Sequence, residues 1–195
     1  MPVNPQTAKQ LAQRNRLATM SSQWAGLTDL QRNSWNDFAL QNPVADKLRQ
    51  SQILSGQQTF VKVNSRLLQS GDATLTDAPI GTAPDAMTGV TATFDIGLGT
   101  TELSFTNTPL GANIKLWMTA SVTNSQGIAF VKNLQRVITI SAAALTSPYD
   151  YQADIEAVFG TLQVGQKVVL FPSTFDTATG LKSGQQRVEG IVVST

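Results

Sequence analysis

Residues 114–122 read Ile-Lys-Leu-Trp-Met-Thr-Ala-Ser-Val, with an apolar residue at every second position from Ile114 to Val122 and Trp117 at the centre. A two-residue period places alternate side chains on opposite faces of an extended chain. The segment therefore predicts a long β-strand that has one face in a hydrophobic core.

Further strands and one helix are expected around this segment. The apolar or alternating runs are Val90–Phe94, Leu103–Phe105, Val137–Ile140, Lys167–Phe171 and Val188–Val193. Gly and Pro residues separate these runs, as is typical of strands joined by turns. One helix is inserted among them, from Asp150 as its cap to Gly160. This spacing predicts an antiparallel β-sandwich-like domain; a single open sheet with the helix on one face is the alternative.

The N-terminal part of the chain has helical periodicity instead, and it predicts about three helices. Starts are indicated at Asn4-Pro5, Thr28–Gln31 and Ser55–Gln58, and ends at Asn42-Pro43 and Gly71. The residues that follow contain two Pro and no periodicity, which favours a linker. The expected fold is therefore α+β, with a helical segment at 1–72, a linker at 73–86 and a β-rich domain at 87–195.

Charge is sparse in this chain. Charged residues make up 14% of it, against roughly 25% in ordinary soluble domains. Such a surface repels its neighbours weakly, which suits a protein that packs among many copies; a merely Thr- and Gln-rich soluble protein is the other interpretation. The net charge of +1 is too small to attract the chain to nucleic acid or to a membrane.

The few charges are distributed unevenly. Residues 1–75 hold eight Lys/Arg and four Asp, a net of +4, and the remainder holds six basic and nine acidic residues, a net of −3. This asymmetry either steers the helical half to an acidic partner or reflects a solvated helix face. Phosphate binding needs clustered cations, and Arg14, Arg16 and Arg32 are too scattered. We therefore do not expect a nucleic-acid partner.

Much catalytic chemistry is excluded by composition. The chain has no His and no Cys, which removes Ser-His-Asp and Cys-His nucleophiles, disulfides and the usual zinc ligands. The carboxylates Asp150, Asp154 and Glu156 remain, but no spacing fixes a catalytic pair or a calcium loop. Gly160 to Lys167 resembles a phosphate-binding loop but has its Lys displaced and a strand after it. We expect no catalytic residue, metal, cofactor or small-molecule substrate.

No secretory signal and no membrane-spanning run is evident in the sequence. We therefore expect a protein that is made in a cytoplasm and has no membrane partner.

The N-terminal part of the chain contains three motifs with characteristic spacing: Asn4-Pro5-x-Thr7-x-x-Gln10-Leu11-x-x-Arg14, Trp24-x-x-Leu27-Thr28-x-x-Gln31-Arg32-x-x-Trp35-x-x-Phe38-Ala39 and Ser55-Gly56-x-x-x-Phe60-Val61-x-Val63-Asn64. These motifs resemble those of a family of small proteins encoded by tailed phages and prophages. Members of this family often have a β-rich C-terminal half. The resemblance implies a phage virion or prophage setting, and it transfers no activity and no binding residues.

These observations predict a virion structural protein. It would be a capsid-associated protein, a portal-vertex protein or a tail accessory protein. It would form homo-oligomers and contact other virion proteins. Trp24, Trp35, Phe38 and Phe60 are the interface candidates, because large aromatic side chains either dock into a neighbouring subunit or hold the helices together as a private core.

Two other classes of function remain open at this point. One is a β-sandwich adhesin or carbohydrate-binding module, with Trp117, Tyr149 and Tyr151 as stacking platforms. The other is an enzyme that uses carboxylates alone.

Overall fold

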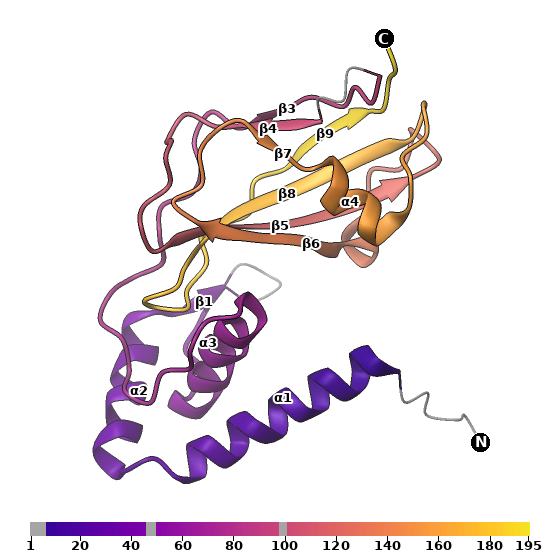
Figure 1. The fold of residues 1–195 in the computed structure, drawn as a ribbon. Coiled ribbons are helices and arrows are strands. Elements are labelled where there is room, and N and C mark those ends of the chain that lie inside the picture. Colours follow the sequence, from indigo (N-terminus) through magenta and orange to yellow (C-terminus); the bar gives the residue numbers. More distant parts are fainter. Residues whose placement is uncertain (1–6, 46–49, 98–100) are drawn as a thin grey trace, which may run out of the picture. The chain divides into compact units, whose positions relative to one another are not determined.

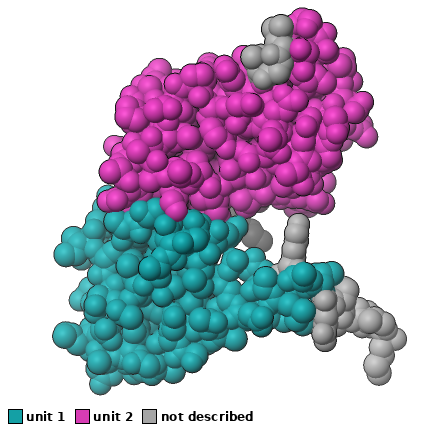
Figure 2. Space-filling model, viewed as in Figure 1, with its two compact units in different colours: residues 1–83, 177–181 teal, residues 84–176, 182–195 magenta. Residues whose placement is uncertain are grey.

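The structure is a computed structural model that describes residues 7–45, 50–97 and 101–195. The chain divides into two compact units, coloured separately in Figure 2. Unit 1 comprises residues 1–83 and 177–181, and unit 2 comprises residues 84–176 and 182–195. An N-terminal helical part and a β-rich C-terminal part, with antiparallel strands, confirm the expected α+β class.

Unit 1 is built on three helices (Figure 1), which are α1 (Ala8–Ala25), α2 (Asp29–Gln41) and α3 (Gly56–Ser70). Thr28 and Gln31 form the expected capping box, and Ser55 and Gln58 form a second one at the expected start of α3. Each box satisfies amide groups of a first helical turn that have no partner within the helix. The expected start at Asn4-Pro5 lies outside the described residues; α1 begins at Ala8 with Thr7 as its cap.

The ends of these helices also follow the sequence signals. Asn42 is the C-cap of α2, and Gly71 ends α3 in the left-handed conformation at φ 79°. A left-handed C-terminal residue favours Gly because it has no Cβ to clash. Between α2 and α3 lies a short hairpin of β1 (Val44–Ala45) and β2 (Ser51–Gln52), which sequence periodicity did not indicate because two residues carry no period.

The segment that was expected to be a linker is largely part of unit 1, whose continuous portion ends at Ala83. The Trp35 indole donates to the Thr76 carbonyl at 2.9 Å. The Asn64 side chain donates to the Leu75 carbonyl and accepts from the Leu75 amide, at 3.0 and 2.7 Å. The expected linker, which has no hydrophobic periodicity, is thus held in place by hydrogen bonds to side chains of α2 and α3. These bonds also give its backbone groups the partners that buried backbone groups need.

A second stretch of unit 1 comes from far along the chain. Thr179, Gly180 and Leu181 are buried, and Gly180 has a φ of +65°. A Cβ on Gly180 would lie 2.5 Å from Val63 Cγ1 and 3.4 Å from Leu67 Cγ on α3. Residues 177–181 therefore complete the packing around α3, and Gly180 permits both the turn and the close approach.

We predict that Gly180→Ala destabilises unit 1 by on the order of 1–3 kcal/mol, because it adds a methyl group where neither the backbone conformation nor the space accepts one. Amide hydrogen exchange in α3 should rise. Gly184→Ala is the matched control, since a Cβ there meets nothing within 4 Å. Equal exchange in both variants would contradict this account of the loop.

Unit 2 contains two antiparallel sheets and a helix (Figure 1). The four-stranded sheet has the order β6 (Arg136–Ala143), β5 (Ile114–Thr123), β8 (Lys167–Asp176), β9 (Val188–Ile191). The three-stranded sheet has the order β3 (Thr91–Ala92), β4 (Glu102–Ser104), β7 (Tyr149–Asp150). The helix is α4 (Gln152–Phe159), and a short 3-10 turn spans Lys132–Leu134.

The strands expected from the sequence are confirmed, with β7 as an addition too short to show a pattern. Asp150 lies two residues before α4, and its carboxylate accepts from the Gln152 amide at 3.0 Å. The expected assignment of Asp150 as the N-cap was wrong, because Tyr151 occupies that position. Asp150 nevertheless accepts a hydrogen bond from the first turn of the helix.

β5 and β8 pair over ten residues, from Ile114 opposite Asp176 to Thr123 opposite Lys167. The residues at even positions of β5 face a core that both sheets and α4 share. Its fully buried members include Leu103, Leu116, Met118, Ile155, Val168 and Leu170. The alternation seen in residues 114–122 therefore corresponds to one buried face. The opposite face carries Trp117, which is also buried.

No helix in the described parts of the chain is both long enough and apolar enough to cross a membrane.

Two buried serines on adjacent strands of unit 2 differ in their hydrogen bonding. The Ser173 hydroxyl donates to the Trp117 carbonyl at 2.9 Å. The Ser121 hydroxyl is fully buried and has no partner among the described residues. A buried polar group without a partner costs free energy, and a paired one does not.

We predict that Ser121→Ala raises the free energy of unfolding by about 1 kcal/mol, whereas Ser173→Ala lowers it by about the same amount. Chemical denaturation followed by circular dichroism measures both changes. A loss of stability in Ser121→Ala would show that its hydroxyl is satisfied after all.

Candidate functional site

The four aromatic residues proposed as interface candidates lie together in unit 1. The ring of Phe60 is 5.2 Å from that of Trp35 and 5.5 Å from that of Trp24, and Trp35 lies 5.7 Å from Phe38. The Trp35–Phe60 and Trp35–Phe38 pairs meet edge to face, which is a favourable aromatic geometry. The cluster joins all three helices of the unit.

Most of this cluster is not available to a partner. Trp35 is 0% exposed, Phe60 is 1% exposed and Phe38 is 3% exposed. The indole of Trp35 also has its hydrogen-bond acceptor inside the unit, at Thr76. In the described chain these residues form the private core of unit 1. The expectation that they dock into a neighbouring subunit is corrected, and Trp24 alone of the four keeps partial exposure.

We predict that Trp35→Ala lowers the stability of unit 1 by about 3–5 kcal/mol, the usual cost of removing a buried aromatic side chain, and that Trp24→Ala costs less. Hydrogen exchange resolved by segment tests this, with α2 and α3 as the reporters and the β5–β8 ladder as the internal reference. Equal protection of α2 in the wild type and in Trp35→Ala would disprove the assignment of Trp35 to the core.

The first half of α1 extends beyond the helix against which it packs. Arg16 Nη1 donates to Gln69 Oε1 at 3.4 Å, and α3 ends one residue later at Ser70. Residues 8–15 therefore continue past the end of α3, by about 12 Å at 1.5 Å per residue. Figure 1 shows this part of α1 extending away from α2 and α3. We call residues 8–15 the α1 overhang.

All side chains described in the α1 overhang are exposed, including Leu11 at 40%. The next apolar residue, Leu17, is 52% exposed, and full burial on this helix begins at Met20. The overhang also belongs to a positively charged part of the sequence, because residues 1–28 contain three Lys/Arg and no Asp/Glu. A further pair of cations lies on α3, where burial and then Arg66 lower the pKa of Lys62 to about 8.

The carboxylates considered for catalysis in unit 2 all have structural partners. Asp150 accepts from the Gln152 amide and the Thr101 hydroxyl, Asp154 accepts from the Tyr149 hydroxyl, and Glu156 accepts from the Leu162 amide. In the described residues no group of three or more acidic side chains is placed to hold a metal ion. The segment from Gly160 is a turn that leads into β8, as expected.

The aromatic residues considered as sugar platforms are largely enclosed. Trp117 is 5% exposed, with the Phe175 ring 5.4 Å away and Lys182 Nζ 4.4 Å from its centroid. Tyr151 is 0% exposed, and its hydroxyl donates to the Thr93 carbonyl at 2.6 Å. Tyr149 is half-buried and donates to Asp154. Trp117 and Tyr151 therefore present no open face of the kind that stacks on a sugar.

The two tyrosines couple the stability of unit 2 to alkaline pH. Burial, and then the hydrogen bond to Asp154, raises the pKa of Tyr149 from 10.0 to about 12. Burial raises the pKa of Tyr151 further still. The folded state thus favours the neutral phenols. Their contribution to the free energy of unfolding is complete below about pH 10, and it is lost as pH rises through the pKa values of the folded state.

We predict that the free energy of unfolding falls between about pH 10 and pH 12, and that Tyr149→Phe makes this fall shallower because a phenyl ring cannot ionise. Urea unfolding at a series of pH values measures the slope. An unchanged slope in Tyr149→Phe would mean that its phenol is not protected by the fold.

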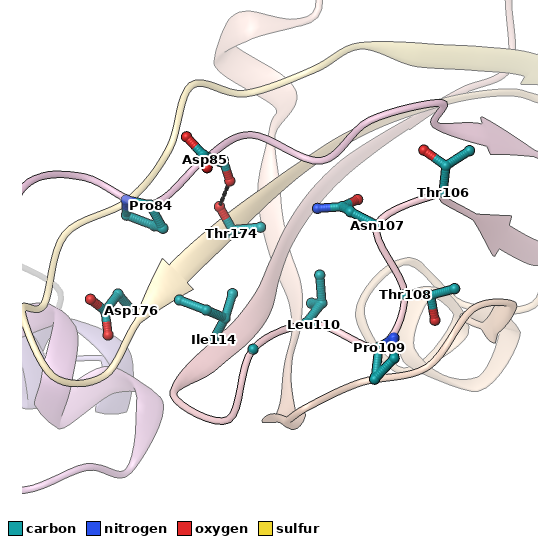
Figure 3. Close-up of a pocket in the computed structure, with 11 residues that line it drawn as sticks. Pro84, Asp85, Thr106, Asn107, Thr108, Pro109, Leu110, Ile114, Thr174 and Asp176 are labelled. Atoms are coloured by element: carbon teal, nitrogen blue, oxygen red, sulfur yellow. Dashed lines mark hydrogen bonds between the residues drawn. The ribbon is translucent and has the colours of Figure 1, made fainter.

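Unit 2 also contains a pocket of about 560 Å³ (Figure 3). Its lining is Pro84, Asp85, Thr106, Asn107, Thr108, Pro109, Leu110, Gly111, Ile114, Thr174 and Asp176. Figure 3 shows the two Asp and Thr174 on one side and Thr106, Asn107 and Thr108 on the other. Two carboxylates line this pocket, and its described lining residues include no Lys or Arg.

Several polar atoms of the pocket already hold its walls in place. The Thr174 hydroxyl donates to the Asp85 carbonyl at 2.7 Å, and the Thr108 hydroxyl accepts from the Ser147 amide at 2.8 Å. The Asn107 side-chain oxygen accepts from the Thr88 amide at 3.1 Å. The walls are therefore fixed by their own hydrogen bonds, and the negative charge comes from Asp85 and Asp176. Sequence reasoning missed this pocket because its residues come from four separate segments.

No family model matches the chain, and no curated protein or solved structure matches it either. The resemblance to phage and prophage proteins therefore remains a prediction from the motifs.

Proposed function

We propose that this chain is a non-catalytic structural protein of a tailed-phage particle, acting by self-association and by contacts with other virion proteins. In the particle, the protein would be associated with the capsid, with the portal vertex or with the tail. The observation that carries the proposal is the α1 overhang, a helical arm whose described side chains are all exposed.

The overhang is the kind of element that assembly contacts stabilise. The overhang is the N-terminal part of the 18-residue helix α1, and packing supplies most of the stability of helices in proteins. The side chains described in residues 8–15 are exposed, so burial within the single chain adds little to the stability of this part of the helix. Docking on another subunit would supply the missing burial and would cover Leu11, which is 40% exposed.

Two further features support a structural role over a catalytic one. The chain lacks His and Cys, and the acidic side chains on and near α4 hold the fold through hydrogen bonds. Two of the three rings expected for the sugar-binding alternative, Trp117 and Tyr151, are packed inside unit 2. No observation favours it as a second candidate.

The proposal predicts that the chain is present in many copies in purified particles of the phage or prophage that encodes it, as measured by quantitative mass spectrometry. Leu11→Ser should lower the copy number several-fold, because it removes apolar area from the overhang without touching a core. Leu30→Ser on α2 is the matched control, since Leu30 is 81% exposed. Particles that lack the wild-type chain altogether would refute the proposal.

A further inference from the structure

One face of α3 carries two partly buried cations. Lys62 and Arg66 are one helical turn apart, and Ser65 lies at the spacing that makes all three side chains neighbours on the helix surface. The core of unit 1 lies against another face of α3, which includes Phe60 and Val63. Lys62, Ser65 and Arg66 are nevertheless only partly exposed. This face is therefore partly enclosed without belonging to the core.

The polar groups on this face lack partners within the described chain. Neither Lys62 nor Arg66 forms an ion pair or a hydrogen bond with a described residue. The hydroxyl of Ser65 is buried and has no hydrogen-bond partner among the described residues. A buried charge without a counter-ion and a buried hydroxyl without a partner both cost free energy. The fold thus leaves three polar groups unsatisfied at one place.

The direction of the pKa shifts agrees with this description. Burial, and then the charge of Arg66, lowers the pKa of Lys62 to about 8. Burial also lowers the pKa of Arg66. A nearby carboxylate would raise the pKa of both groups instead, because it would stabilise their charged forms.

Further positive charge lies at the end of the same face. Gln69 is one helical turn beyond Ser65, and its Oε1 accepts from Arg16 Nη1 on α1 at 3.4 Å. Residues 1–28, which include α1, contain no Asp or Glu. The electrostatic potential beside Lys62 and Arg66 is therefore positive and favours an anion.

We propose that the face of α3 formed by Lys62, Ser65 and Arg66 binds a phosphate group in its dianionic form. The ammonium of Lys62, the guanidinium of Arg66 and the hydroxyl of Ser65 donate hydrogen bonds to its oxygens. Guanidinium pairs with phosphate through two parallel hydrogen bonds. This site is separate from the α1 overhang, and it does not depend on the proposed virion role.

The number of charges selects this class of ligand. Inorganic phosphate or a phosphate monoester carries about −1.5 to −2 at pH 7, which balances the two cations. A carboxylate, or one phosphodiester of nucleic acid, carries a single negative charge and would leave one cation uncompensated.

Isothermal titration calorimetry of the full-length chain with inorganic phosphate at low ionic strength tests the site. Lys62→Met and Arg66→Met should each weaken binding by about tenfold or more. Ser65→Ala should weaken it several-fold although the net charge is unchanged, which separates a hydrogen-bonded site from general attraction to cations. Lys132→Met is the matched control, because it removes an exposed cation from unit 2, and it should bind like the wild type.

Thermal unfolding provides a second readout and verifies that the variants are folded. Without phosphate, Lys62→Met should melt no lower than the wild type, because an apolar side chain of similar length replaces a buried cation that has no counter-ion. Phosphate should raise the melting temperature of the wild type by mass action and that of Lys62→Met much less. Binding at about pH 8 should also take up protons in the wild type, because the dianion restores the full charge of Lys62.

Two results would overturn the site: no phosphate binding by the wild type, or equal binding by the wild type, Lys62→Met and Ser65→Ala. A duplex DNA without terminal phosphates serves as the competing ligand. If it binds more tightly than inorganic phosphate and loses binding in the same variants, the site reads a nucleic-acid backbone and the proposed dianion is wrong.

Discussion

The pairing of β5 with β8 is the constraint on which most of unit 2 depends. The side chains of a strand alternate between faces, so a shift of one residue in this ten-residue ladder would turn Leu116 and Met118 out of the shared core. β6 and β9 take their positions from β5 and β8 respectively. The ladder also fixes where β8 ends, and the chain leaves unit 2 directly after that point, at Asp176. One register thus determines both the core of unit 2 and the start of a segment that belongs to unit 1.

The two units use their few charges and aromatic rings differently. Unit 1 places its aromatic rings at the centre, where α1, α2 and α3 meet, and leaves the described side chains at the start of α1 exposed. In unit 2 the carboxylates near α4 are used in hydrogen bonds within the fold, while Asp85 and Asp176 line the pocket.

The sequence predicted the elements that depend on local chemistry. The capping pairs Thr28–Gln31 and Ser55–Gln58 act within one helical turn, and the alternation in β5 reflects a single strand. Contacts between distant segments were not predictable. Residues 73–83 show no periodicity because hydrogen bonds from Trp35 and Asn64, rather than a buried apolar face, hold them. The pocket leaves no local signal either, because it forms where separate loops meet. Trp35, Phe38 and Phe60 were correctly recognised as large aromatic anchors, but their spacing could not distinguish a core from an interface.

The placement of residues 177–181 in unit 1 has a consequence for the order in which the protein matures. Translation supplies α1, α2 and α3 early, yet the residues that pack against Val63 and Leu67 are added only after most of unit 2 has been synthesised. Domains generally fold as they emerge from the ribosome, from the N-terminus onward. Unit 1 cannot follow that order to completion: its last packing contact must wait for β8. The packing around α3 is therefore completed only after β8 has been synthesised, when most of unit 2 is also present.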